Sequence, residues 1–155
     1  MPNEDLKEKI LNEMLADHSN ALEKNFQLAK QFFRITKEGK VDVLVKDKLI
    51  LQDKVALYLI GKRYAFLAGL TKSEYVKNEE LMTELGLPKG SLLPALMKLR
   101  DSHMLVEGPK EGNVTSQAIA LNVIERALRG IGNVLAIKDI NLDRSTTNNN
   151  QNGGN

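Results

Sequence analysis

Residues 78–115 read NEELMTELGLPKGSLLPALMKLRDSHMLVEGPKEGNVT, and this stretch decides the fold. Its beginning suits a short helix that Asn78 caps and that stops at Gly86. A second helix opens at residues 87–91. Its leucines recur at helical spacing, which predicts one buried stripe formed by Leu92, Leu96 and Leu99. We therefore expect two short helices around a glycine turn.

The remainder of the stretch carries strand and turn signals. Residues 104–106 (Met-Leu-Val) predict a strand, residues 108–113 are a turn cluster, and Val114 and Thr115 begin a returning strand. Two helices followed by a hairpin is a layout that can place a helix in the major groove of DNA.

Residues 53–116 resemble winged helix-turn-helix domains, particularly those of small archaeal proteins. The segments LGLPKGS (85–91) and LRDSHMLV (99–106) carry the resemblance, and similar patterns extend through ITKEGKV (35–41) and YLIGKRY (58–64). The resemblance implies a mainly α fold with a small β-hairpin wing. It does not fix a function, because such domains serve as transcription regulators, architectural DNA binders and protein-docking modules.

Residues 1–39 predict an amphipathic helical arm. Apolar residues recur at spacings of mostly three or four from Leu6 to Phe33, and cap-type residues interrupt them at 17–20. Two interpretations remain open for the arm. It folds as a helical hairpin over the rest of the domain, with Asn20 and Glu23 starting the second helix, or it forms one long helix that pairs with a second copy.

Residues 40–132 predict the winged-helix domain itself. A short strand is expected at 41–45, where it could pair with the wing. Asp53 is expected to cap a buried central helix from Lys54 to about Ala68, which Gly69 ends.

The C-terminal part predicts a last helix and a tail. Ser116 is expected to cap a helix through about Arg129, which Gly130 and Gly132 end. Residues 133–144 predict a docking segment. Residues 145–155 consist almost entirely of Asn, Thr, Gln, Ser and Gly, and predict a disordered tail.

The composition argues against catalysis and cofactors. The chain has no cysteine and only two histidines, His18 and His103, neither with a partner at the spacing of a metal site. No set of residues suggests a nucleophile with a base, so we expect a non-enzyme without metal or cofactor. The polar N-terminus and the absence of a long apolar run predict a cytoplasmic protein that does not enter a membrane.

Charge supports nucleic-acid binding only in part. The basic surplus lies in residues 40–78, whereas residues 79–110 carry nearly equal numbers of basic and acidic side chains. The resemblance makes residues 89–100 the recognition helix. The expected contacts to double-stranded DNA are Lys62, Arg63, Lys89, Ser91, Lys98, Arg100 and Lys110.

The same helix also carries apolar residues where base contacts are needed. Leu93, Pro94 and Met97 can read at most a thymine methyl group, so an alternative is that this face docks a protein partner without DNA. The apolar stripe of the arm additionally predicts a homodimer, whose two-fold symmetry would suit paired DNA half-sites.

Overall fold

The central element is helix α4 (Leu51–Leu67), which is buried almost all round. The structure, a computed structural model, describes residues 2–15, 18 and 20–136. The predicted central helix is confirmed, but it starts earlier than expected: Ile50 is the N-cap, and Asp53 lies in the first turn. Gly69 ends it as predicted, with φ of 77°, where the left-handed conformation suits glycine.

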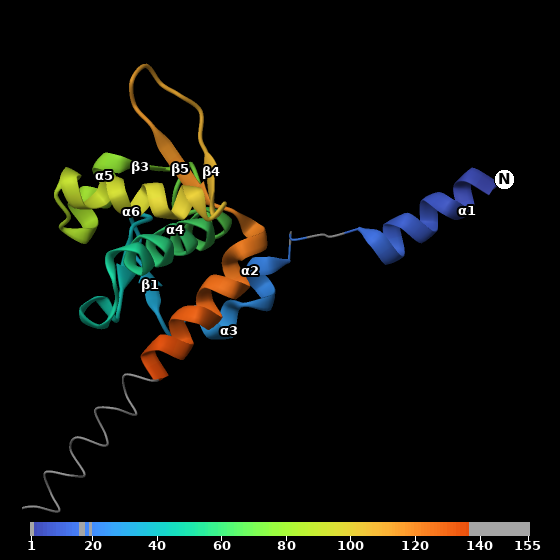
Figure 1. Ribbon diagram of the computed structural model, residues 1–155, viewed down its shortest axis with the longest axis horizontal. Helices are drawn as coiled ribbons and strands as arrows, with labels where there is room; N and C mark the ends of the chain where they lie inside the picture. The colour runs from blue at the N-terminus through green and yellow to red at the C-terminus, as the bar shows by residue number, and fades with distance from the viewer. Residues whose placement is uncertain (1, 16–17, 19, 137–155) are drawn as a thin grey trace, which may run out of the picture.

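Helices α5 (Asn78–Leu85) and α6 (Lys89–Asp101) pack on α4 and on each other (Figure 1). Gly86 links them in the left-handed conformation, with φ of 64°. The predicted leucine stripe of α6 is confirmed, because Leu92, Leu96 and Leu99 are all buried. Each such side chain contributes about 1.5–3 kcal/mol by leaving water, so the stripe fixes α6 to the core.

A three-stranded antiparallel sheet combines one strand that precedes these helices in the sequence with two strands that follow them. Its strands β3 (Val76–Lys77), β4 (Leu105–Glu107) and β5 (Ser116–Ile119) lie in the order β3-β5-β4. The strand predicted at 104–106 is confirmed one residue further on, and the returning strand starts two residues later than expected. The helix predicted from Ser116 is wrong there, because Ser116 belongs to β5, whose backbone pairs on both sides with β3 and β4.

The N-terminal part differs most from its prediction. Helix α1 (Pro2–Lys9) runs into the π-helix η1 (Ile10–Met14) and stands clear of the rest in Figure 1. The single-turn helices α2 (Ala21–Lys24) and α3 (Phe26–Ala29) come next. The continuous long helix is therefore wrong. The covering hairpin is also wrong, because Leu6 and Ile10 remain exposed.

A second sheet replaces the predicted end of the arm. Strand β1 (Phe33–Ile35) pairs antiparallel with β2 (Val41–Val43), and the short 3-10 turn η2 (Lys46–Lys48) leads on to α4. The strand expected at 41–45 is thus confirmed in part, but it pairs with β1 and not with the wing. Phe33, Val41 and Val43 face the core, where the hairpin packs on α4.

The last described part is the 3-10 turn η3 (Leu121–Val123) followed by a helix over residues 124–136. The expected stop at Gly130 and Gly132 is wrong, since both lie inside this helix. Its buried face, with Ile124, Leu128 and Ile131, overrides the low helix propensity of glycine. Residues 133–136 of the predicted docking segment are helical. The remainder of that segment and the predicted tail lie outside the described residues.

The fold is therefore mainly α with two small antiparallel sheets. Among residues 2–15, 18 and 20–136, no helix is both long and apolar enough to cross a bilayer.

Candidate nucleic-acid interface

The outer face of α6 is the first candidate surface. A helix turns by about 100° per residue, so Gly90, Pro94, Met97 and Asp101 lie along the line opposite the leucine stripe. Leu93 is 41% exposed and Met97 58% exposed, and Pro94 is exposed as well. The predicted apolar patch of Leu93, Pro94 and Met97 therefore faces solvent and is not part of the core.

Pro94 lies inside α6 and not in its first turn. Because α6 begins at Lys89, Pro94 is its sixth residue. Proline has no N–H, so the carbonyl of Gly90 lacks its usual donor four residues on. Gly90 is exposed, and no heavy atom lies within 4 Å of the place where its Cβ would be. At Gly90, near the N-terminal end of the exposed face, the backbone is therefore not covered by a side chain of its own.

Most of the predicted cations are available to a partner. Lys89, Lys98 and Arg100 are exposed on α6, Ser91 is half-buried there, and Lys110 is exposed in the loop between β4 and β5. Arg100 has only a loose ion pair, with its Nε 3.9 Å from Glu107 Oε1, and both side chains are largely exposed. Such a pair stabilises little and can be exchanged for a phosphate contact.

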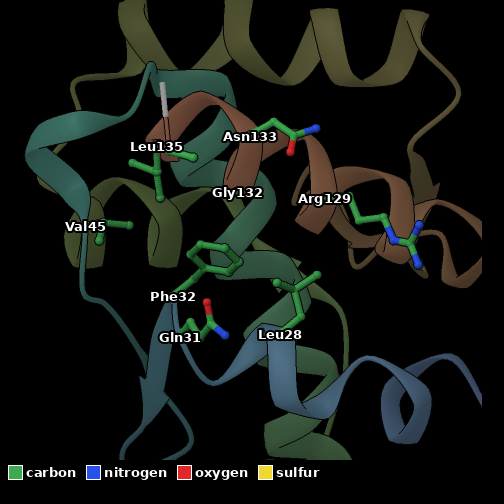
Figure 2. A pocket seen from close by; sticks show the side chains of 9 residues that line it. Leu28, Gln31, Phe32, Val45, Arg129, Gly132, Asn133 and Leu135 are labelled. Carbon is green, nitrogen blue, oxygen red and sulfur yellow. The ribbon is translucent and has the colours of Figure 1, made fainter. Parts of the chain in front are cut away.

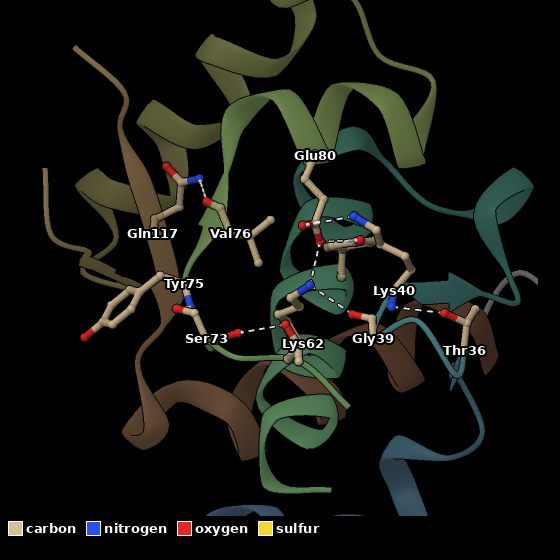
Figure 3. A network of polar contacts seen from close by, with 11 residues as sticks. Thr36, Gly39, Lys40, Lys62, Ser73, Tyr75, Val76, Glu80 and Gln117 are labelled. Carbon is tan, nitrogen blue, oxygen red and sulfur yellow. Dashed lines mark hydrogen bonds and ion pairs between the residues drawn. The ribbon is translucent and has the colours of Figure 1, made fainter. Parts of the chain in front are cut away.

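Two predicted contacts are not available. Lys62 is only 4% exposed, and its Nζ lies 2.9 Å from both the Glu80 carboxylate and the carbonyl of Gly39 (Figure 3). Arg63 Nε donates to the carbonyl of Ile119 at 2.9 Å, and its guanidinium pairs with Glu74 at 3.1 Å. Both cations hold parts of the fold together, so the prediction that they contact DNA is wrong.

The surroundings of Glu80 form a polar cluster that the sequence did not reveal. Glu80 on α5 accepts from Tyr58 at 2.6 Å and from Lys62 at 2.9 Å, and Lys40 lies 3.3 Å from its other oxygen. Burial alone would raise the pKa of Glu80. The two hydrogen bonds and the charges of Lys62 and Lys40 outweigh burial and hold the pKa below its ordinary value.

This cluster joins three segments. Lys62 comes from α4, Glu80 from α5, and Gly39 and Lys40 from the turn between β1 and β2. Burial, followed by the neighbouring Glu80 carboxylate, raises the pKa of Tyr58, so its hydroxyl remains a donor at neutral pH. The polar cluster therefore links the β1–β2 hairpin to helices α4 and α5.

Acidic groups limit the positive field near α6. Glu107 and Glu111 in the hairpin and Asp101 at the end of α6 are all exposed, and Lys77 pairs loosely with Glu111 at 3.6 Å. A phosphate backbone approaching this face would thus meet a few separate cations and no continuous basic patch.

A further cavity is lined by no residue of α6. Figure 2 shows it between the segment around Phe32 and the helix over residues 124–136, with a volume of about 630 Å³. Leu28, Val45 and Leu135 give it apolar walls, and Gln31, Asn133 and Arg129 are its polar groups. Arg129 is already paired with Glu125 at 2.8 Å.

No metal site is present in the described part of the chain, where no three His, Asp or Glu side chains gather. His103 ends α6 in the left-handed conformation, with φ of 58°, and its N–H donates to Arg100 O at 2.9 Å. It is an exposed turn residue.

Comparisons with known proteins give no relative. The chain matches no family model, no curated protein and no solved structure.

Proposed function

We propose that this chain is a non-catalytic winged helix-turn-helix protein that binds double-stranded DNA, as a transcription regulator or an architectural protein. The observation that carries the proposal is the pairing of α5 and α6 across the left-handed Gly86, which leaves one whole face of α6 exposed. In that arrangement α6 enters the major groove and the loop between β4 and β5 lies against the backbone beside it.

The chemistry of the exposed face supports weakly selective binding. Lys89, Lys98, Arg100 and Lys110 suit phosphate oxygens, whereas the centre of the face offers glycine, proline and methionine to the bases. Specificity by side-chain hydrogen bonds is therefore low. With about four phosphate contacts, the logarithm of the binding constant should fall with the logarithm of salt concentration with a slope of roughly −4.

A homodimer is part of the proposal. Leu6, Ile10 and Met14 are exposed along one side of α1 and η1, and a second copy would cover them. Two-fold pairing would also present two α6 helices to successive half-sites on one side of the duplex.

A protein-docking role is the second candidate, and one observation favours it. Leu93, Pro94 and Met97 form an exposed apolar surface at the centre of α6, and such a surface suits the apolar face of a partner helix.

Gel shifts with a random-sequence duplex at low and moderate salt test the DNA proposal. The variant Lys89→Glu with Lys110→Glu should lose the shift while its circular dichroism stays that of the unchanged chain. The matched control is Lys37→Glu with Arg126→Glu, which makes the same charge change at exposed sites outside α6 and outside the β4–β5 hairpin. Equal loss in both variants, or in neither, would contradict the proposal.

A further inference from the structure

A second cavity lies where α3, β1 and α4 meet. Its volume is about 330 Å³, near the lower end of ligand-binding cavities. Phe26 and Ala29 come from α3, Phe33 from β1 and Tyr64 from α4. Three of its seven lining residues are therefore aromatic.

The aromatic rings of this cavity are arranged for contact with another ring. The centroids of Phe33 and Tyr64 are 5.8 Å apart and those of Phe26 and Tyr64 are 6.5 Å apart, both pairs tilted. Phe26 is 50% exposed, so one ring of the group still lacks a partner on its outer side. Aromatic pairs gain from tilted or offset packing at these separations.

Two cations border this apolar space. Lys30 and Arg34 both line it, and Lys30 Nζ lies 5.7 Å from the centre of the Phe26 ring. No carboxylate of the described residues forms an ion pair with either cation. Asp42 faces Arg34 across the β1–β2 ladder, but the Arg34 guanidinium instead donates to the carbonyls of Lys30 and Phe33.

Tyr64 adds no negative charge to the cavity. Its hydroxyl donates to the carbonyl of Leu22 at 2.6 Å, and burial raises the pKa of Tyr64 to about 12. The cavity thus combines a neutral aromatic wall with two cations that form no ion pair with the carboxylates of the described residues.

We propose that this cavity binds a small aromatic carboxylate, with the ring against the wall of Phe26, Phe33 and Tyr64 and the carboxylate at Lys30 and Arg34. Charge complementarity selects the anion, since neither cation forms an ion pair with a carboxylate of the described residues, and a carboxylate accepts from guanidinium and ammonium groups. The small volume favours a compact ligand over a peptide or a helix. The site is independent of the proposed DNA contacts, because it shares no residue with them.

The test uses 2-naphthoate and its neutral analogue 2-naphthamide on the full chain. The chain contains no tryptophan, so naphthyl fluorescence can be followed with little protein background. We expect saturable binding of one 2-naphthoate per chain, about tenfold or more tighter than that of 2-naphthamide, as charge-assisted hydrogen bonds imply. Octanoate as competitor separates an aromatic preference from a general one for apolar acids.

Variants locate the site. Lys30→Gln with Arg34→Gln should reduce 2-naphthoate binding to the level of 2-naphthamide and leave the amide unchanged. The control Lys37→Gln with Arg126→Gln removes the same charge elsewhere and should have no effect. Phe26→Ala should weaken both ligands, whereas Phe66→Ala, at another half-exposed phenylalanine, should weaken neither.

Three results would overturn the proposal. They are equal binding of acid and amide, an affinity for octanoate in competition equal to that for 2-naphthoate, and loss of binding in the control pair as large as in the Lys30 and Arg34 pair. If Arg34→Gln unfolds the chain, Lys30→Gln alone and Arg34→Lys serve instead. The first should weaken 2-naphthoate and the second should retain part of its affinity.

Discussion

Lys62 on α4 and Glu80 on α5 form an ion pair of 2.9 Å within the fold, and the same ammonium group also donates to the carbonyl of Gly39. One buried lysine thereby connects the central helix, the first helix of the pair and the N-terminal hairpin. Removing one member of such a pair leaves the other charge and a backbone carbonyl without a partner, which is costly away from water.

We therefore expect Lys62→Met to lower the free energy of unfolding by about 2 kcal/mol or more. Glu80 keeps Lys40 and Tyr58 and is 18% exposed, which reduces the loss from that of a fully buried pair. Urea denaturation measures the change, with Lys37→Met as the exposed control. Equal effects of the two substitutions would show that the Lys62 contacts contribute nothing to stability.

The polar cluster around Glu80 also predicts that the stability of the chain falls in acid. The pKa of Glu80 is lowered in the folded chain, so its contribution to stability is complete above its ordinary value of 4.5 and is lost as the pH falls toward the folded value. Glu80→Gln should thus destabilise the chain at neutral pH. The difference between the two proteins should narrow between about pH 5 and pH 3. A difference that stays constant over this range would contradict the lowered pKa.

Two glycines in helices should respond in opposite ways to alanine. At Gly61 an added Cβ would lie 2.5 Å from a methyl carbon of Val41, where the β1–β2 hairpin rests on α4. We expect Gly61→Ala to cost about 1–3 kcal/mol through overpacking. Gly90→Ala meets nothing within 4 Å and should instead stabilise α6 by up to about 1 kcal/mol. Thermal or urea melts of both variants decide the comparison.

The apolar patch of α6 separates the two proposed functions. Leu93→Asp with Met97→Lys should leave the thermal melt nearly unchanged, because both side chains are largely exposed. If α6 enters the groove, the new aspartate meets phosphate-rich surroundings and the gel shift weakens. Undiminished DNA binding together with loss of a dimer or of a co-purifying partner would favour the docking function instead.

The arm predicts the oligomeric state. Ile10→Glu places a charge within the exposed stripe of Leu6, Ile10 and Met14, and should convert a dimer into a monomer. Asn12→Glu adds the same charge on the other side of the arm and should leave the dimer intact. Sedimentation equilibrium at micromolar concentration reports both. A monomer before any substitution would remove the homodimer from the proposal.

Local signals in the sequence predicted helices α4, α5 and α6 well. The leucines of α6 repeat at helical spacing, and Gly69 and Gly86 end α4 and α5 with the positive φ that favours glycine. These features depend on neighbours within a few residues. They can therefore be read without knowing what the segment packs against.

The missed features depend on distant partners. The sequence predicts helix at β1 because Phe33 fits either period, and only the pairing of Phe33 with Val43 makes this segment a strand. Ser116 looked like a helix cap, but its segment pairs on both sides with strands far away in the sequence. The sequence predicts Lys62 as a surface cation, because its partner Glu80 is 18 residues away along the chain. No local pattern shows that the fold brings the two together. The sequence alone could predict the exposed cations of α6 and of the loop between β4 and β5. It could not predict the cavity lined by Phe26 and Tyr64.

Pro94 gives the outer face of α6 a polarity that its side chains do not have. Since proline has no N–H, the Gly90 carbonyl lacks its usual donor four residues on, and Gly90 is exposed. In a DNA complex of the proposed kind, this main-chain oxygen can accept a hydrogen bond from the amino group of adenine or cytosine. The preference for one base over another would then arise from the backbone, so that it would survive substitution of every side chain on that face except Pro94 itself.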